Sequence, residues 1–222
     1  MSPFLLFSAL HLALFLGTFS RYFSAAVPLN FLRLLLLSLA VDNAVVGIGD
    51  GNLDAQWYAW CTRLRYALHA LVLPGLVPWG LSLLPRPLPR WLLWGSAMFV
   101  LGAIGYGAWH EIMALELGAS VPGQPPRLVS TAPGPPLATV LGNLLFLCLA
   151  AVIWYRSRWP WAFAGGLLIL LVNGAMAGQP QALVAGALAE LVFIVSLLAS
   201  ESGRARILAA AVNVSKKGQD ND

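Results

Sequence analysis

Long apolar stretches alternate with short polar connections along most of this chain. A helix that crosses a bilayer needs about 20 mostly apolar residues. The stretches lack the period-two alternation of strands, and a backbone inside lipid must satisfy its own hydrogen bonds, so we expect helices. Seven stretches qualify, at residues 4–19, 34–49, 60–83, 92–114, 137–155, 161–177 and 182–200. The pattern predicts an all-α, multi-pass membrane protein whose transmembrane domain is a seven-helix bundle over residues 1–200.

Composition agrees with this class. Hydrophobic residues make up 59% of the chain and charged residues 10%, and the mean hydropathy is +0.77. Soluble domains contain roughly 25% charged residues. We therefore expect the lipid bilayer as the partner of most of the surface, and no nucleic acid.

Basic residues concentrate on alternate connections, which predicts an orientation. Of the 13 Lys and Arg residues, ten flank the first, third and fifth connections or follow the last stretch: Arg21, Arg33, Arg86, Arg90, Arg156, Arg158, Arg204, Arg206, Lys216 and Lys217. By the positive-inside rule the N-terminus lies outside, and residues 201–222 form a partly disordered cytoplasmic tail. We expect the cell membrane as the location. No basic residue precedes Phe4, which favours a retained first helix over a cleaved signal peptide.

Two further features fit this topology. The nine tryptophans map to or near the predicted helix ends, where indole rings prefer the headgroup level. Residues 118–136 form the one long outer loop, which is rich in Pro and Gly and is expected to be extended. We interpret this loop as a connector, with a lid over an outward pocket as the alternative.

Ionisable residues within the apolar stretches mark the candidate site, because each costs about 2.5 to 3.5 kcal/mol at the centre of a membrane helix. Asp42, Arg65, His69 and Glu190 fall roughly 8 to 14 Å below the predicted outer ends. Arg65 and His69 are four residues apart and share a helix face, whereas Arg63 points away. A buried guanidinium needs a carboxylate, and Asp42 or Glu190 is available at its depth.

These four residues are the leading ligand-pocket candidates. A second rank comprises Asn43, Tyr66, His11, His110, Glu111 and Asn173, which fall in the same outer half. By contrast, the cytoplasmic halves of the stretches contain no charged residue. The alternative interpretation is a structural clip, in which the Arg–acid pair only holds helices together.

A metal or haem is the less favoured interpretation of the histidines. Three His with Asp42 suit zinc and two His suit haem b, but the chain lacks HxxxH, HExxH and CxxC spacings. Arg65-Tyr66 followed by Pro74 resembles the third helix of microbial rhodopsins, which are seven-helix proteins. The resemblance covers about ten residues of this chain. Glu190 stands in the last helix, where that family carries its retinal lysine, so we expect no retinal Schiff base.

The outer and inner halves of the predicted helices differ in polarity, and this difference favours one class of function over the others. A polar outer half above an apolar inner half favours a pocket that binds or transforms an amphiphile of the lipid, quinone or isoprenoid class. A carboxyl group in an apolar pocket can also act as an acid. The alternative is a small-solute or proton-coupled transporter, supported by the glycines at 95, 102, 105 and 107 that would permit sliding contacts. A third interpretation is a non-catalytic subunit of a membrane complex.

Overall fold

The computed structural model describes residues 2–20, 23, 27–85, 87–131 and 137–210, and they are mostly helical. The α-helices are α1 (Pro3–Gly17), α2 (Val27–Gly47), α3 (Gln56–Val72), α4 (Leu76–Leu81), α5 (Arg90–Gly107), α6 (Leu137–Ser157), α7 (Trp161–Met176) and α8 (Ala182–Ser202). The 3-10 turn η1 (Leu73–Gly75) joins α3 to α4, and the π-helix η2 (Ala108–Met113) extends α5. The predicted disordered segment at 216–222 lies outside the described residues.

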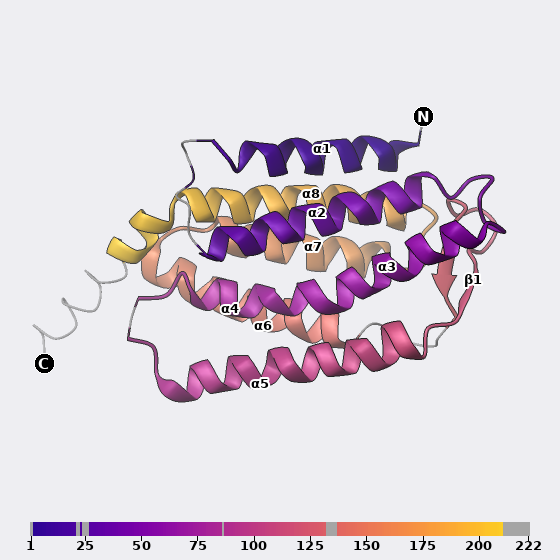
Figure 1. The fold of residues 1–222 in the computed structure, drawn as a ribbon. Helices are drawn as coiled ribbons and strands as arrows, with labels where there is room; N and C mark the ends of the chain where they lie inside the picture. The colour runs from indigo at the N-terminus through magenta and orange to yellow at the C-terminus, as the bar shows by residue number, and fades with distance from the viewer. Residues whose placement is uncertain (1, 21–22, 24–26, 86, 132–136, 211–222) are drawn as a thin grey trace, which may run out of the picture.

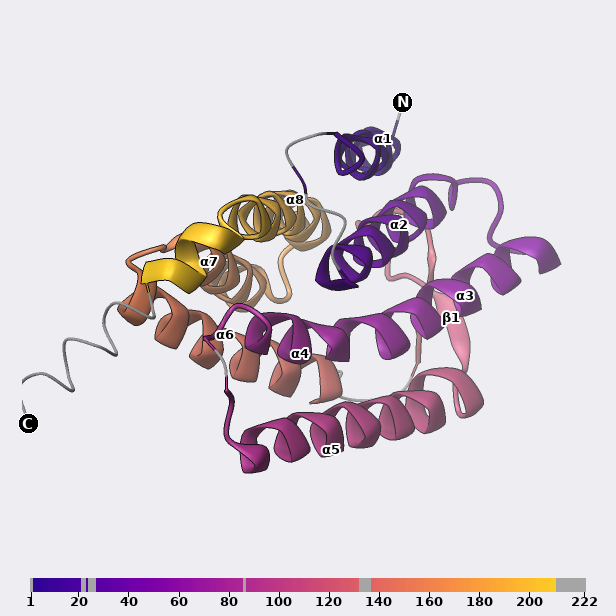
Figure 2. The same ribbon diagram turned by 60° about the vertical axis from the view of Figure 1, so that its left-hand side comes forward.

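The long helices lie side by side along one common direction (Figure 1). Helix α1 lies at one edge, against α2 and α8, and α5 lies at the opposite edge, against α3, α4 and α6 (Figure 2). The chain reverses direction between successive long helices, so the connections gather at two ends. We call the end with the N-terminus, the start of α3 and the α7–α8 connection the hairpin end, and the end where α8 finishes the tail end.

Within the described residues, four helical segments are long and apolar enough to cross a membrane. They are Val27–Gly47, Arg90–Met113, Leu137–Ser157 and Ala182–Ser202. Helices α1 and α7 are apolar but shorter, with 15 and 16 residues. The protein therefore has the composition of a membrane protein. Large apolar side chains on its outer surface fit this class, since Trp91 and Trp94 on α5 are 73% and 70% exposed.

Apolar side chains from α2, α4, α6 and α8 meet in one central core. Trp79 of α4 packs against Phe146 of α6 at a ring-centre distance of 6.0 Å, and Phe146 contacts Phe193 of α8 at 5.7 Å. Helices α7 and α8 approach closely, because a Cβ atom on Gly165 would lie 2.6 Å from the side chain of Ser196. Small residues allow such close approach of membrane helices.

Helix α2 begins earlier than the sequence predicted, at Val27 rather than at residue 34. Arg33 therefore lies inside the helix and not on a connection. Its Nε donates to Oγ1 of Thr18 and its Nη2 to the Thr18 carbonyl oxygen, both at 3.0 Å. A cation at a helix C-terminus satisfies free carbonyl groups there. The Arg33 side chain thus caps α1, and this is why its charge can be placed within α2.

The third predicted stretch, 60–83, is not one regular helix. Helix α3 begins at Gln56 and ends at Val72, and Pro74 lies in the 3-10 turn that follows. Proline has no backbone N–H and cannot continue the α-helical ladder without disruption. The fourth stretch also departs from an α-helix at its end, where η2 has the wider π geometry that often occurs at functional sites.

The outer loop contains a short antiparallel hairpin formed by β1 (Leu117–Ala119) and β2 (Leu128–Ser130), with Leu117 opposite Ser130. The sequence predicted only an extended loop here. Part of that loop, residues 132–136, lies outside the described residues. The hairpin packs beside α3, and its tip contacts the α2–α3 connection, because a Cβ atom on Gly49 would collide with the carbonyl oxygen of Pro126.

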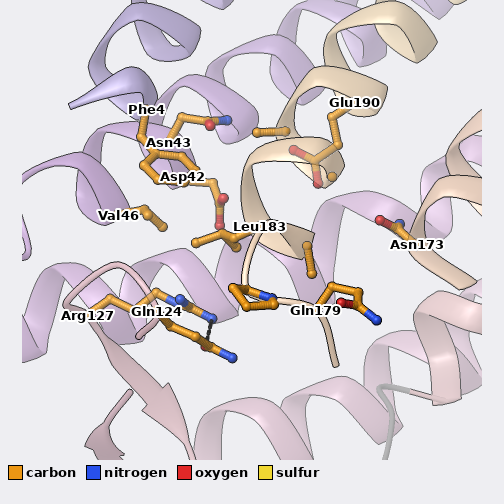
Figure 3. A pocket seen from close by; sticks show the side chains of 14 residues that line it. Phe4, Asp42, Asn43, Val46, Gln124, Arg127, Asn173, Gln179, Leu183 and Glu190 are labelled. Atoms are coloured by element: carbon orange, nitrogen blue, oxygen red, sulfur yellow. Dashed lines mark hydrogen bonds between the residues drawn. The ribbon is translucent and has the colours of Figure 1, made fainter. Parts of the chain in front are cut away.

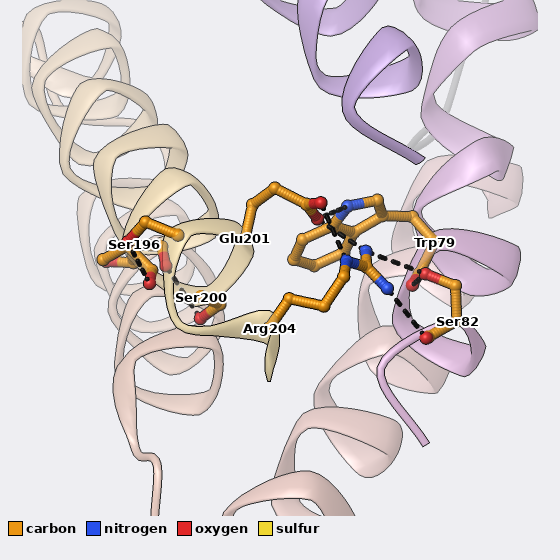
Figure 4. Close-up of polar contacts among 8 residues, drawn as sticks. Trp79, Ser82, Ser196, Ser200, Glu201 and Arg204 are labelled. Atoms are coloured by element: carbon orange, nitrogen blue, oxygen red, sulfur yellow. Dashed lines mark hydrogen bonds and ion pairs between the residues drawn. The ribbon is translucent and has the colours of Figure 1, made fainter. Parts of the chain in front are cut away.

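The tail end contains a buried polar cluster that the sequence analysis did not predict (Figure 4). Nε1 of Trp79 donates to Oε2 of Glu201 at 3.2 Å, and Arg204 binds both oxygens of Glu201 at 2.8 and 2.5 Å. Arg204 also donates from Nη1 to the Ser82 carbonyl oxygen and from Nη2 to the Ser82 hydroxyl. Helix α8 continues past the predicted end at residue 200, so the buried charge of Glu201 lies within it. Trp79 is a core residue rather than an interface anchor.

Candidate functional site

The candidate site is centred on an ion pair between α2 and α3. Nε of Arg65 lies 2.6 Å from Oδ1 of Asp42, and the two side chains are only 13% and 15% exposed. The sequence left Asp42 and Glu190 open as partners of Arg65, and the structure gives the contact to Asp42. Nη1 of Arg65 is buried and has no hydrogen-bond partner among the described residues.

Helical spacing brings two more side chains of α3 to this pair. His69 follows Arg65 by four residues, and its Nδ1 lies 3.6 Å from Oδ1 of Asp42. The ring of Tyr66 lies 5.0 Å from Cζ of Arg65, in a cation–π contact. The Tyr66 hydroxyl accepts a hydrogen bond from the backbone N–H of Ser130 at 2.8 Å. Tyr66 therefore connects the ion pair to strand β2.

Asp42 faces a cavity of about 220 Å³ at the hairpin end, between α2, α8 and two connections (Figure 3). Glu190 of α8 points into the same space from the opposite side. The wall has a polar part and an apolar part. Its polar residues are Asp42, Asn43, Gln124, Arg127, Asn173, Gln179 and Glu190, and its apolar side chains include Phe4, Val46, Leu183 and Ala187.

Glu190 differs from Asp42 in its contacts. Within the described residues it makes no hydrogen bond and no ion pair, although Asp42 and Arg65 are near enough to interact with it electrostatically. It is half-buried because its carboxyl group opens into the cavity. Arg65 forms its ion pair with Asp42, and no basic side chain among the described residues forms one with Glu190.

The outer loop supplies cavity residues that the sequence analysis did not select. Nη2 of Arg127 donates to Oε1 of Gln124 at 3.3 Å, and both side chains line the cavity. Nε of Arg127 is buried and unpartnered among the described residues. Burial lowers the pKa of Arg127, and the nearby charge of Arg65 lowers it further. In the sequence, the only feature that sets Arg127 apart is that it is the one basic residue on a predicted outer connection.

Two second-rank residues on α1 and α2 lie beside the site. Asn43 is buried, lines the cavity and donates from Nδ2 to the carbonyl oxygen of Leu39 at 3.0 Å. His11 is fully buried, and its Nδ1 donates to the carbonyl oxygen of Phe7 at 2.8 Å. Nε2 of His11 has no partner among the described residues. His11 is not among the residues that line the cavity.

The remaining second-rank pair lies on the π-helix η2. His110 stacks on Tyr106, with ring centres 5.4 Å apart. Glu111 is buried against the neighbouring helices, and its Oε1 is unpartnered within the described part of the chain. It is near enough to His69 and His110 for an electrostatic interaction. Asn173 of α7, the last second-rank residue, lines the cavity opposite Asp42.

The histidines do not gather into a metal site in the described residues, where no three His, Cys, Asp or Glu side chains lie close enough to hold an ion. His69 contacts Asp42, His110 stacks on Tyr106 and His11 faces Phe7. The two cysteines, Cys61 and Cys148, are free thiols. The chemistry that this set of residues supports is hydrogen bonding and proton transfer by carboxyl and imidazole groups.

Comparison with protein-family models, with curated proteins and with solved structures found no match.

Proposed function

We propose that this chain is a seven-span membrane protein that binds an amphiphilic ligand, of the lipid, quinone or isoprenoid class, in the cavity between α2 and α8. The observation that carries the proposal is the cavity wall, which combines the carboxyl groups of Asp42 and Glu190 with the apolar side chains of Phe4 and Leu183. Such a wall matches a molecule with a polar head and an apolar chain.

The seven spans are α1, α2, α3 with α4, α5 with η2, α6, α7 and α8. Four of them have the length and composition of membrane helices, and α1 and α7 lie alongside these helices in the same direction of the bundle. Helix α1 has 15 residues, or roughly 22 Å at 1.5 Å per residue. This is shorter than the roughly 30 Å hydrocarbon core, so the bilayer would be thinner beside α1 in this proposal.

The hairpin end faces outward in this proposal. The tail end carries Arg33, Arg90, Arg156 and Arg204, whereas the hairpin end carries Asp50, Asp54 and Glu116 as well as Arg127. A test uses single cysteines at Val121 and Ser202, both exposed, in a chain without Cys61 and Cys148. A membrane-impermeant maleimide should label Val121→Cys in intact cells and Ser202→Cys only after permeabilisation. The reverse pattern would refute the orientation.

The size of the cavity limits what part of the ligand it can hold. Pockets that enclose a drug-sized ligand measure about 300 to 1,000 Å³. The cavity of about 220 Å³ is smaller, so it fits a polar head group with a few carbons of the chain. An apolar cluster lies beside the cavity and is formed by Phe4, Val46 and Ala187. This cluster gives the first carbons of the ligand's apolar chain a dry contact surface.

The test measures the lipids that remain bound to protein purified from membranes, by mass spectrometry. Gly186→Leu fills the cavity, since Gly186 lines it and a Cβ atom there would already lie 3.2 Å from Oδ1 of Asn173. Gly105→Leu is the matched control, because a Cβ atom on Gly105 meets no described atom within 4 Å. We expect one lipid class to be retained by the wild type and the control and lost from Gly186→Leu. Equal retention in all three would contradict the proposal.

Transport of a small solute or of protons is the second candidate, because Glu190 lines the cavity and His69 lies close to Asp42 on the cavity wall. It ranks lower because the buried hydrogen-bonded cluster of Trp79, Glu201 and Arg204 joins α4 to the end of α8 at the tail end. Of the α5 glycines, only Gly107 approaches another helix, at Ala70, while Gly95, Gly102 and Gly105 meet no described atom. Flux of a solute in proteoliposomes, driven by a gradient, would favour transport over ligand binding.

A further inference from the structure

A second, smaller cavity of about 70 Å³ lies deeper in the bundle, on the other side of Glu190. Glu190 and Asn173 line both cavities, so these two side chains form the boundary between them. The polar residues of the small cavity are His69, Thr139, Asn143, Asn173 and Glu190, and its apolar residues are Leu35, Leu39, Leu73, Ile169 and Phe193. Five polar side chains from four helices thus face one space beside the apolar core.

The small cavity has the size and the lining that buried water needs. One water requires about 10 to 15 Å³ of such volume and 2 to 4 polar partners. Truly empty cavities in proteins are lined by apolar groups. The small cavity meets both conditions for water, with carboxyl, imidazole, amide and hydroxyl groups on its wall.

Glu190 and His69 are the two titratable side chains on this wall. Neither forms a hydrogen bond with a described side chain that would block proton exchange, and His69 has Asp42 on its other side at 3.6 Å. The other charged groups around them are Arg65 on α3, which is bound to Asp42, and Glu111 on η2, which interacts electrostatically with His69 and with His110. From the hairpin loop, Arg127 faces the outer cavity that Glu190 also lines.

We propose that water in the small cavity connects Glu190 to His69 and that a proton passes between them. The O–H bond of the Glu190 carboxyl group breaks, its proton moves through water, and a ring nitrogen of neutral His69 gains a proton. The products are a Glu190 carboxylate and a His69 imidazolium beside the carboxylate of Asp42. Glu190 then regains a proton from the outer cavity, and His69 holds the transferred proton. When Glu190 next loses its own proton to the outer cavity, it takes the proton back from His69 through the water, so the relay exchanges one proton between that cavity and His69.

The proton relay goes beyond ligand binding and can be tested without adding a ligand. Infrared spectroscopy of the purified protein follows the C=O band of a protonated carboxyl group as a function of pH, and the band that disappears in Glu190→Gln belongs to Glu190. In His69→Gln we expect the midpoint of this band to shift by about one pH unit, which is tenfold in proton affinity. His11→Gln is the matched control, because His11 is buried but does not line the small cavity, and it should leave the midpoint unchanged.

A second variant tests the water itself and covers the case in which His69→Gln fails to fold. Asn143→Leu replaces a polar wall residue with an apolar one and fills the space without removing a titratable group. The C=O band of Glu190 should then move to higher frequency, as expected for a carboxyl group that has lost its hydrogen-bonded water. A band that neither variant changes, or that His11→Gln shifts equally, would overturn the relay. Because no lipid is added, that result would leave the proposed ligand site standing.

Discussion

Neutralising Asp42 separates a structural role of the ion pair from a role in ligand binding. Asp42→Asn preserves the shape of the side chain and removes its charge. At the observed 2.6 Å, and with an effective dielectric constant of about 20, the Coulomb attraction to Arg65 is about 6 kcal/mol. In the native pair, desolvation of both groups offsets much of this attraction, but in the variant Arg65 keeps its desolvation without a carboxylate.

Removing one member of a buried pair typically destabilises a protein by about 3 to 5 kcal/mol. The two side chains retain 13% and 15% exposure, so we expect the lower end, about 3 kcal/mol. The double variant Asp42→Asn/Arg65→Gln removes both charges and should be less destabilised than the sum of the single variants, by about 2 kcal/mol. The free energy of unfolding can be measured in mixed micelles with an increasing fraction of dodecyl sulfate, followed by tryptophan fluorescence.

Arg63→Gln is the matched control on the same helix. Arg63 is exposed and makes one hydrogen bond, from Nη1 to the carbonyl oxygen of Leu115, so its loss should cost less than about 1 kcal/mol. A loss below about 1 kcal/mol in Asp42→Asn, or strict additivity in the double variant, would refute the ion-pair reasoning. If the stability falls as expected while lipid retention is unchanged, the pair is a structural clip.

Two further predictions concern the rest of the bundle. Glu201→Gln should lower the free energy of unfolding by about 2 to 3 kcal/mol, because Arg204 would lose its buried charged partner. The same micelle titration measures this loss. An unchanged unfolding midpoint would contradict a stabilising role of the cluster. Gly165→Ala should destabilise by about 1 to 3 kcal/mol through the collision with Ser196. Gly174→Ala, on the same helix but with open space around its Cα, should be neutral or slightly stabilising, and equal effects would argue against close α7–α8 packing.

The ion pair shows how far a sequence can identify a membrane site. Arg65 lies within an apolar stretch and not on a connection between stretches. The free-energy cost of an unpaired charge in lipid predicts an acidic partner at a similar depth. That reasoning led to Asp42 and to the face shared with His69, and the structure has both contacts. The choice between Asp42 and Glu190 was beyond the sequence, because it depends on how α2 and α8 are rotated relative to α3.

The outer loop shows what this reasoning missed. Depth below the membrane surface can be counted from the sequence only for residues within a predicted membrane helix. Gln124 and Arg127 lie on a connection, so their depth could not place them at the cavity. Their positions depend on the turn between β1 and β2 and on the contact of Pro126 with Gly49. Neither feature has a periodic signal in the sequence. Both side chains line the cavity, so this part of the loop forms part of the cavity wall.

The two buried arginine clusters differ in how completely they are satisfied, and this difference favours a functional role for one of them. At the tail end, Arg204 donates from Nε, Nη1 and Nη2, and its acid Glu201 also accepts from Trp79. At the hairpin end, Nη1 of Arg65 is buried without a partner among the described residues. An unsatisfied buried polar atom destabilises a fold by about 1 to 3 kcal/mol, more when it is charged. A cluster that only held helices together would be expected to resemble the one at Arg204. The unpartnered Nη1 of Arg65 and the Glu190 carboxyl group, which has no hydrogen-bond partner among the described residues, therefore support the bound molecule and the water proposed above.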